Sequence, residues 1–346
     1  MKYRYHIGLD AHSRNCVFAV MDSEGRLEER AKIPTTDSEL LRYIKRWRSP
    51  VALAFEETTI SQWLYVLLEN EVEHLVVCDP KANKRPGAKT DKVDAVELAD
   101  LLRVNRLRPV FHTNDERVEL RALVSGYGDL VQEIVRTKNR YSAIYRQSAI
   151  RLGGTRCYTN KEMLGVLQSK YQRFVARSLL EQIALLEEHK KSYQDLFERN
   201  MKRFREMKWI SSVPGLGPTT TNQIVGIVVS PWRFATKYKL FSYAMLTKHS
   251  QMSDGVEYGK RRVNGNTQLK SIFKQAALSA TRVCKENAFK RKYEKMLQQG
   301  ASERAARNAV ARALAATVLA VWKRGKNYSD RYREVMQQRC GCRKRT

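Results

Sequence analysis

Acidic side chains are scarce in this sequence. Its 346 residues include 64 Lys and Arg against 36 Asp and Glu, a formal charge of +28. So much positive charge repels itself in a compact chain unless a polyanion compensates it. Nucleic acid fits best, because each phosphate that a basic side chain neutralises releases counterions. A hydrophobic content of 42% and the length of the chain indicate two or three domains with proper cores.

Long apolar runs are also absent. No stretch approaches the ~18 apolar residues of a membrane-spanning helix, and the opening residues MKYRYHIGLD lack the apolar core of a signal peptide. An acidic membrane surface is the competing partner, but the basic residues are spread over several segments and not gathered on one amphipathic helix. We therefore expect a cytoplasmic protein with no membrane partner.

Cysteine is too sparse to predict a disulfide scaffold or a zinc site. The six cysteines are scattered, apart from Cys340 and Cys342, which form a lone CxC with no second pair and no nearby histidine. Structural zinc needs four ligands, and thiols in a cytoplasm stay reduced. We interpret residues 331–346 as a basic tail.

The first hundred residues predict alternating strands and helices. β-rich runs at 5–10, 16–21 and 27–33 form a three-stranded meander. A helix capped by Thr36 or Asp37 follows, and then strands at 51–55 and 74–78 alternate with helices at 61–69 and from Thr90 or Asp91 onward. This is the element order of the ribonuclease H-like fold, although periodicity alone leaves other mixed α/β folds open.

The remainder of the sequence predicts helices. Between Arg136 and Arg177, within the polar helical segment 115–207, ten basic residues accompany one acidic residue, Glu162. Basic side chains can hold phosphates while tyrosines stack on bases, so we interpret this segment as a nucleic-acid arm. A solvated helix face with the tyrosines in the core is the alternative. The tyrosines are Tyr141, Tyr145, Tyr158 and Tyr171, and the candidate phosphate ligands are Arg136, Lys138, Arg140 and Arg146.

Residues 210–228, ISSVPGLGPTTTNQIVGIV, predict two helices joined by a tight turn. The turn Pro214-Gly215-Leu216-Gly217 resembles a helix-hairpin-helix, in which backbone N–H groups at the start of the second helix can hold a phosphate. An ordinary helix hairpin explains a lone GxG equally well. Residues 267–323 read as amphipathic helices rich in Lys and Arg.

Four acids fall where the predicted elements would bring them together. Asp10 closes the first strand, Glu56 closes the strand after the first helix, and Asp91 and Asp94 share one face of a helix start. Carboxylates at neighbouring strand ends with a facing helix can hold two divalent ions about 4 Å apart. Such hard, oxygen-seeking ions are Mg²⁺ or Mn²⁺. A turn or a helix cap explains each acid alone, and spacing does not choose between Glu56 and Glu57.

A family resemblance rests on these motifs. The segments IGLDAHSRN, VALAFEETT and KTDKVDAVELADLL resemble the three acidic motifs of the DEDD-type transposases of insertion sequences. This family includes a pilin-gene invertase and bridge-RNA-guided recombinases. ISSVPGLGPTT, SYAMLTKHSQMSDG and NGNTQLKSIFKQAAL resemble its C-terminal signature, so the resemblance covers roughly residues 4–283.

The resemblance implies three domains. They are a ribonuclease H/RuvC-like α/β domain at 1–113, a helical coiled-coil insertion at 114–206, and a mostly α C-terminal transposase domain at 207–330. The last would contain the helix-hairpin-helix-like turn.

The resemblance also assigns site residues by motif. The metal-binding acids would be Asp10, Glu56, Asp91 and Asp94, with Glu56 preferred because Thr58 completes the family's Glu-x-Thr. Ser253 matches the serine nucleophile that links covalently to DNA, with Ser250 as the near alternative. A serine hydroxyl needs activation, which metal held by the four acids would supply if the two domains meet. The basic residues expected to hold phosphates nearby are Lys260, Arg261, Arg262 and Lys270.

The sequence departs from the family pattern beside the site. Thr59 stands where a glycine is common, Met245-Leu-Thr-Lys248 replaces Gly-Leu-x-Pro, and Asp254 interrupts Ser-Gly. The resemblance implies a prokaryotic, nucleoid-associated enzyme that cuts and rejoins DNA as a dimer or tetramer, with a structured guide RNA as a further partner. The alternatives are a RuvC-like nuclease that uses water as its nucleophile and a non-catalytic nucleic-acid-binding protein.

Overall fold

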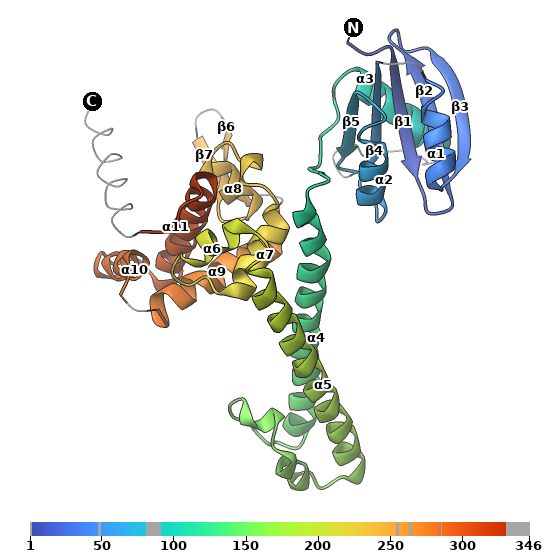
Figure 1. Cartoon of the computed structure of the whole chain (residues 1–346). Coiled ribbons are helices and arrows are strands. Elements are labelled where there is room, and N and C mark those ends of the chain that lie inside the picture. The colour runs from blue at the N-terminus through green and yellow to red at the C-terminus, as the bar shows by residue number, and fades with distance from the viewer. Residues whose placement is uncertain are drawn as a thin grey trace, which may run out of the picture. The chain divides into compact units, whose positions relative to one another are not determined.

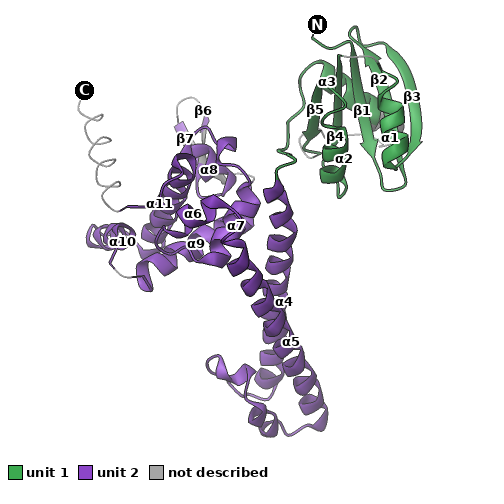
Figure 2. Ribbon diagram, viewed as in Figure 1, with its two compact units in different colours: residues 1–115 green, residues 116–346 purple. Residues whose placement is uncertain are grey.

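The chain forms two compact units, residues 1–115 and 116–346, in a computed structural model (Figures 1 and 2). The structure describes residues 2–47, 50–80, 91–253, 256–262, 265–284 and 286–329. The predicted basic tail at 331–346 therefore lies outside the described residues. Among the described helices, none is long and apolar enough to cross a membrane.

The first unit is built on one mixed sheet. Its strands are β1 (Tyr5–Ala11), β2 (Asn15–Asp22), β3 (Leu27–Pro34), β4 (Val51–Glu56) and β5 (His74–Cys78). β1, β2 and β3 form the predicted antiparallel meander, and β4 and β5 extend it parallel to β1, which gives the order β3-β2-β1-β4-β5. The helices are α1 (Asp37–Ile44), α2 (Ser61–Leu68) and α3 (Asp91–Arg103). The predicted order of elements is confirmed.

Side-chain alternation gives the sheet two buried faces. One face packs against α1 and α2 and includes Ile7, Leu9, Leu53, Phe55, Leu40 and Leu64. The other face packs against α3, where Ala52 and Ala54 contact Leu102. Gly8 also lies on this second face, so close to α3 that an added Cβ would overlap the Ala95 carbonyl oxygen. A residue without a side chain is what allows α3 to lie directly on β1.

The second unit is mostly helical. Its α-helices are α4 (Glu119–Gln147), α5 (Lys170–Asn200), α6 (Arg205–Ser211), α7 (Pro218–Val228), α8 (Lys237–Tyr243), α9 (Thr267–Arg282), α10 (Ala288–Gln298) and α11 (Glu303–Arg324). Short 3₁₀ turns are η1 (Glu116–Val118), η2 (Arg156–Tyr158), η3 (Lys161–Val166) and η4 (Pro231–Arg233). A two-stranded hairpin, β6 (Lys248–Ser253) and β7 (Val256–Arg262), was not predicted from the sequence.

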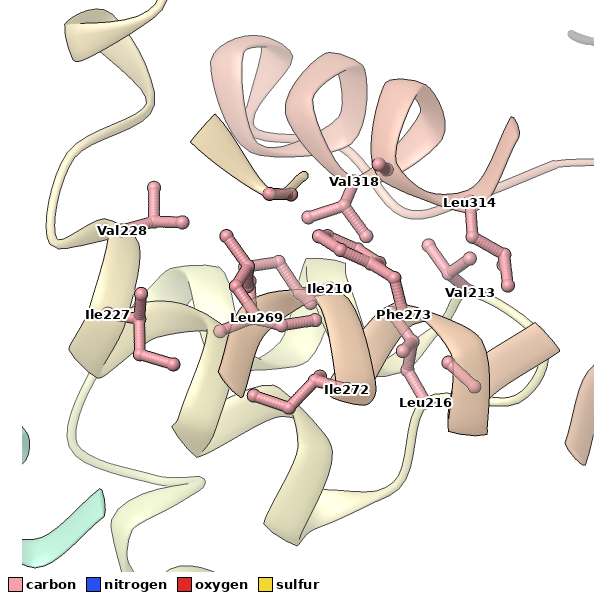
Figure 3. Packing of buried hydrophobic residues seen from close by; sticks show 14 of the residues in the cluster. Ile210, Val213, Leu216, Ile227, Val228, Leu269, Ile272, Phe273, Leu314 and Val318 are labelled. Carbon is pink, nitrogen blue, oxygen red and sulfur yellow. The ribbon is translucent and has the colours of Figure 1, made fainter. Parts of the chain in front are cut away.

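The core of the second unit lies between α6, α7, α9 and α11. Figure 3 shows Ile210, Ile227, Phe273 and Val318, one from each of these helices, in one cluster. Leu120 of α4 belongs to the same core, as does Phe197 of α5. The predicted coiled-coil segment at 114–206 and the predicted C-terminal domain at 207–330 thus share one core at the base of α4 and α5.

α4 and α5 form a long helical hairpin that projects from this core (Figure 1). Its distal end has a small core of its own, in which Tyr141 and Tyr145 pack with Leu179 and Ile183. Ser169 caps the start of α5 by accepting a hydrogen bond from the Gln172 backbone N–H.

Candidate catalytic site

Asp10 and Glu56 lie at the carboxyl ends of adjacent parallel strands. Leu9 pairs with Phe55 in the β1–β4 ladder, so Asp10 and Glu56 are the next residues along each strand. Alternation from Gly8 and Ala54 places both acids on the face that α3 covers. The Asp10 side chain is 18% exposed, and Glu56 is partly buried. The structure therefore brings these two predicted acids to one edge and one face of the sheet.

Glu57, the alternative to Glu56, is held by a different group. Its Oε2 lies 2.6 Å from Nε2 of His112, and the other ring nitrogen of His112 lies 3.0 Å from the Gln62 side-chain oxygen. The His112 ring is almost fully buried, and the Gln62 amide also donates to the Thr113 carbonyl at 2.9 Å. These hydrogen bonds hold the segment after α3, which contains His112, against Glu57 and α2. The role of His112 was not predicted from the sequence, because a lone histidine far from Glu57 in sequence gives no signal of this contact.

Ser61 fixes the turn that follows Glu56. The Thr58 backbone N–H donates to Ser61 Oγ at 2.6 Å, and the Ser61 hydroxyl donates to the Glu56 carbonyl at 3.4 Å. Thr59, which stands where the family has a glycine, is exposed and is not among the residues of positive φ. A β-branched residue is therefore accommodated at this position without backbone strain.

His12 lies beside Asp10 but on the solvent side. Its Nε2 is 3.2 Å from Asp10 Oδ2, and its ring is 56% exposed. Because the His12 ring is exposed, this contact contributes little to stability. His12 is a surface histidine that can orient the Asp10 carboxylate.

α3 begins at Asp91, as the sequence predicted. The side chains of Asp91 and Asp94 lie outside the described residues, as does the whole segment 81–90. In sequence the two aspartates precede Ala95 and Leu98 by four residues, one helical turn, and both of those residues are buried. Among the side chains that the structure describes, no three from His, Cys, Asp and Glu gather as metal ligands.

Ser253 is the last residue of β6. It pairs with Val256 at the start of β7, so it stands at the tip of the hairpin. Its side chain and the connecting residues 254–255 lie outside the described part of the chain. Lys260 pairs with Ser250, and Arg261 and Arg262 follow it along β7. Lys270 lies on α9, in the first turn after the Asn266 cap.

Met245 shows what one departure from the family pattern costs. It occupies the glycine position of the Gly-Leu-x-Pro motif and has a φ of 49°. This left-handed conformation favours glycine, and a residue with a Cβ loses on the order of 1 kcal/mol there. Met245 thus adopts, just before β6, a backbone conformation that glycine would adopt with less strain.

The two helices and the tight turn predicted for residues 210–228 are α6, α7 and the turn between them. Gly215 has a φ of 88°, and a Cβ there would overlap the Ala276 carbonyl oxygen of α9. Gly217 precedes α7, is exposed, and provides no side-chain cap. Gly215 is thus required for the close packing of this turn against α9.

The predicted nucleic-acid arm contains basic residues in two different settings. Arg136 and Arg140 pair with Glu133 at 2.7 and 3.9 Å, while Lys138 binds Glu187 of α5 at 2.6 Å. The hydrogen bond from Lys138 lowers the pKa of the Glu187 carboxyl below its ordinary value. Arg146 is exposed, farther along α4.

The tyrosines of the arm also divide into two groups. Tyr141 and Tyr145 are fully buried with their hydroxyls 2.9 Å apart, and burial raises the pKa of Tyr141. Base stacking is therefore wrong for these two, and the alternative interpretation as core residues holds, because α5 and η3 cover them. Tyr171 is 72% exposed, and Phe174, which was not among the residues predicted from the sequence, is 75% exposed.

Comparison with known proteins identifies the family. A DEDD-type transposase family model matches residues 7–149, and a model described as the transposase IS116/IS110/IS902 family matches residues 207–294. The first match includes β1 with Asp10, β4 with Glu56, and α3; the second includes the β6–β7 hairpin with Ser253. No curated protein matches the chain. The two matches occur in the order that the sequence motifs predicted, and this chain belongs to the IS110 family of transposases.

Proposed function

We propose that this chain is a DNA recombinase in which four acids hold divalent metal and Ser253 attacks a DNA phosphate. Membership of a transposase family supports DNA as the substrate. The observation that carries the acid site is the position of Asp10 and Glu56, at adjacent strand ends on the face that α3 covers. A structural role for both acids would not require them to share that edge and that face.

The first unit is, on this proposal, a ribonuclease H/RuvC-like domain. The strand order β3-β2-β1-β4-β5, the antiparallel β2 and the helix after β5 support it. In this arrangement the carboxyl ends of β1 and β4 and the start of α3 define one side of the sheet, where the four acids would act together.

The donor set fits a hard divalent ion. Asp10 and Glu56 offer carboxylate oxygens, and Asp91 and Asp94 would add two more carboxylates. Oxygen-only ligands favour Mg²⁺ or Mn²⁺ over softer metals. When bound, such ions would activate an attacking oxygen and offset charge on the leaving one. The part of the protein is to hold the carboxylates at a fixed spacing, which the β1–β4 ladder does for Asp10 and Glu56.

The chemistry proposed for Ser253 is a transesterification. The serine oxygen bonds to phosphorus while the bond from phosphorus to one deoxyribose oxygen breaks, and the hydroxyl proton passes to that leaving oxygen. The phosphodiester is thereby replaced by a phosphoserine ester, so no external energy source is needed. Attack by the hydroxyl of a second DNA end releases the serine and joins the strands. Lys260, Arg261, Arg262 and Lys270 would hold the phosphates of the bound strand.

The proposed reaction requires an assembly. Exchange between two duplexes takes several cuts, so we propose a homodimer or homotetramer in which acids and serine act on the same phosphodiester. The basic residues of the α4–α5 hairpin, and the resemblance of the sequence motifs to those of bridge-RNA-guided recombinases, support a structured RNA as a further partner.

The test is formation of a covalent adduct. Purified protein, with its co-purifying nucleic acid retained, is incubated with the DNA ends of its element and Mg²⁺, and protein–DNA adducts are resolved on a denaturing gel. We expect an adduct with the unmodified chain that Ser253→Ala, Asp10→Ala and Glu56→Gln all abolish. Ser250→Ala and Glu57→Gln are the matched controls and should keep it.

The other outcomes identify the alternatives. Cutting without an adduct, unaffected by Ser253→Ala, would sink the serine mechanism and leave a metal-dependent nuclease. Tight DNA binding with no cutting in Mg²⁺ or Mn²⁺ would favour a non-catalytic binding protein.

A further inference from the structure

Charge compensation changes along the α4–α5 hairpin. The shaft is the part of the hairpin formed by residues 119–145 of α4 and 178–200 of α5. Within it, Glu133 pairs with Arg136 and Arg140, and Glu187 pairs with Lys138 and Lys190. These acids neutralise much of the basic charge at the middle of α4 and α5. Of these pairs, Lys138–Glu187 joins α4 to α5, and the others lie within one helix. This middle part of the hairpin therefore presents little net charge.

The distal end differs. Residues 146–177 contain seven basic side chains and one acid, Glu162. Within this part of the chain, which the structure describes throughout, none of the seven forms an ion pair. They are Arg146, Arg151, Arg156, Lys161, Lys170, Arg173 and Arg177. Charge of one sign, concentrated at the end of a projecting hairpin, favours binding of a polyanion.

Two exposed aromatic rings lie within this basic region. Tyr171 is 72% exposed and Phe174 is 75% exposed. They stand three residues apart in the first turns of α5, on one helix face. Leaving two large rings in water is unfavourable, and they are too few for a second hydrophobic core. Exposed apolar groups of this kind indicate a binding surface.

The rings are held by a rigid support. Ala176, Leu179 and Leu180, on the opposite face of α5, pack against Tyr141 and Tyr145 of α4. Arg173 lies between Tyr171 and Phe174 in sequence, and its guanidinium donates to the Leu167 carbonyl at 3.1 Å. The Lys170 ammonium lies 5.1 Å from the centre of the Tyr171 ring. Cations and aromatic faces are therefore presented together.

The charge and the aromatic rings at the distal end of the hairpin indicate which molecule binds there. A second copy of this surface would carry the same uncompensated positive charge and would be repelled. Bases inside a duplex already stack on one another, whereas an unpaired strand offers free base faces beside its phosphates, which aromatic rings and cations can bind together. We propose that Tyr171 and Phe174 stack on unpaired bases of a DNA strand and that the seven basic side chains bind its phosphates. The inference rests on the proposed function only for the choice of DNA.

The test measures binding by the full chain. It uses fluorescence anisotropy of a labelled oligothymidine, a duplex of equal length and an oligouridine RNA. It is performed with Ser253→Ala protein in EDTA, so that failure of the metal or serine mechanism does not affect the result. Loss of one stacked base typically weakens binding by a factor of about 5 or more. We expect Tyr171→Ala with Phe174→Ala to weaken oligothymidine binding by at least about 20-fold and to leave duplex binding nearly unchanged.

Matched variants separate stacking from general disruption. Tyr171→Phe and Phe174→Tyr should restore binding, since either ring presents a π face. Leu185→Ala removes an exposed apolar side chain from the shaft of the same helix and should have no effect. Arg173→Gln with Arg177→Gln should instead reduce the salt dependence for every DNA. Circular dichroism checks that all variants remain helical.

Four results would overturn the proposal. The first is unchanged oligothymidine binding in the double alanine variant. The second is an equal loss of binding to duplex and single strand, and the third is a loss confined to the RNA. The fourth is a change of oligomeric state by analytical ultracentrifugation with DNA binding intact, which would make the surface a contact between copies of the chain.

Discussion

Replacing Gly8 by alanine would test whether close packing of α3 on β1 builds the acid site. An added Cβ would overlap the Ala95 carbonyl oxygen and lie 2.6 Å from the Ala99 backbone nitrogen. Both are backbone atoms within a helix, so neither can rotate away. Relief requires α3 to move from the sheet by roughly 1 Å, and overpacking of this kind costs about 1–3 kcal/mol. We expect the upper part of that range, because no side chain can absorb the clash.

The loss should be measurable on this unit alone. With a urea dependence of about 2 kcal/mol per M, a cost of about 2–3 kcal/mol lowers the unfolding midpoint by roughly 1–1.5 M. Hydrogen exchange with mass spectrometry, at increasing urea, follows the β1 and α3 peptides separately from the helical unit. Under the proposed function, the same displacement at the start of α3 should also slow metal-dependent cutting by about 100-fold.

A second glycine provides the control. A Cβ at Gly153 would meet nothing within 4 Å, so Gly153→Ala should leave stability and cutting unchanged. If Gly8→Ala matched Gly153→Ala in both measurements, the reasoning that the packing of α3 on β1 requires glycine at position 8 would be refuted.

Two further predictions concern ion pairs of the second unit. Arg117→Met strips the Glu206 carboxylate, 4% exposed, of its guanidinium partner and should lower the free energy of unfolding by about 3 kcal/mol in urea titrations. Arg203→Met, with exposed partners, should cost under about 1 kcal/mol, and equal losses would contradict the buried-pair argument. The pKa of Glu187 is lowered from 4.5, so its pairing stabilises the hairpin fully above that pH and is lost as pH falls through the lower folded value. The protection factors of the α5 amides, which correct for the intrinsic slowing of exchange at lower pH, should fall on acidification in the unmodified chain but not in Lys138→Met, and identical pH profiles would exclude the pair as the cause.

The family motifs and the order of elements could be predicted from the sequence because both depend on local pattern. Thr36 caps α1 through the Glu39 backbone N–H, and α3 begins at Asp91, as expected from capping residues and helical spacing. The β6–β7 hairpin was missed since KHSQMS and VEYGKRR lack apolar alternation. Their strand structure comes from pairing with each other.

The sequence by itself determined which residue types were available at which elements: acids at strand ends, and basic and aromatic residues on the helical arm. Only the tertiary structure decided which neighbours surround each of them. His112, distant in sequence, holds Glu57, whereas Glu56 lies on the α3 face. Packing of α5 and η3 buries Tyr141 and Tyr145 but leaves Tyr171 and Phe174 exposed. Helical and strand periods fix the side of an element to which a side chain points, but only the folded chain places a neighbour on that side.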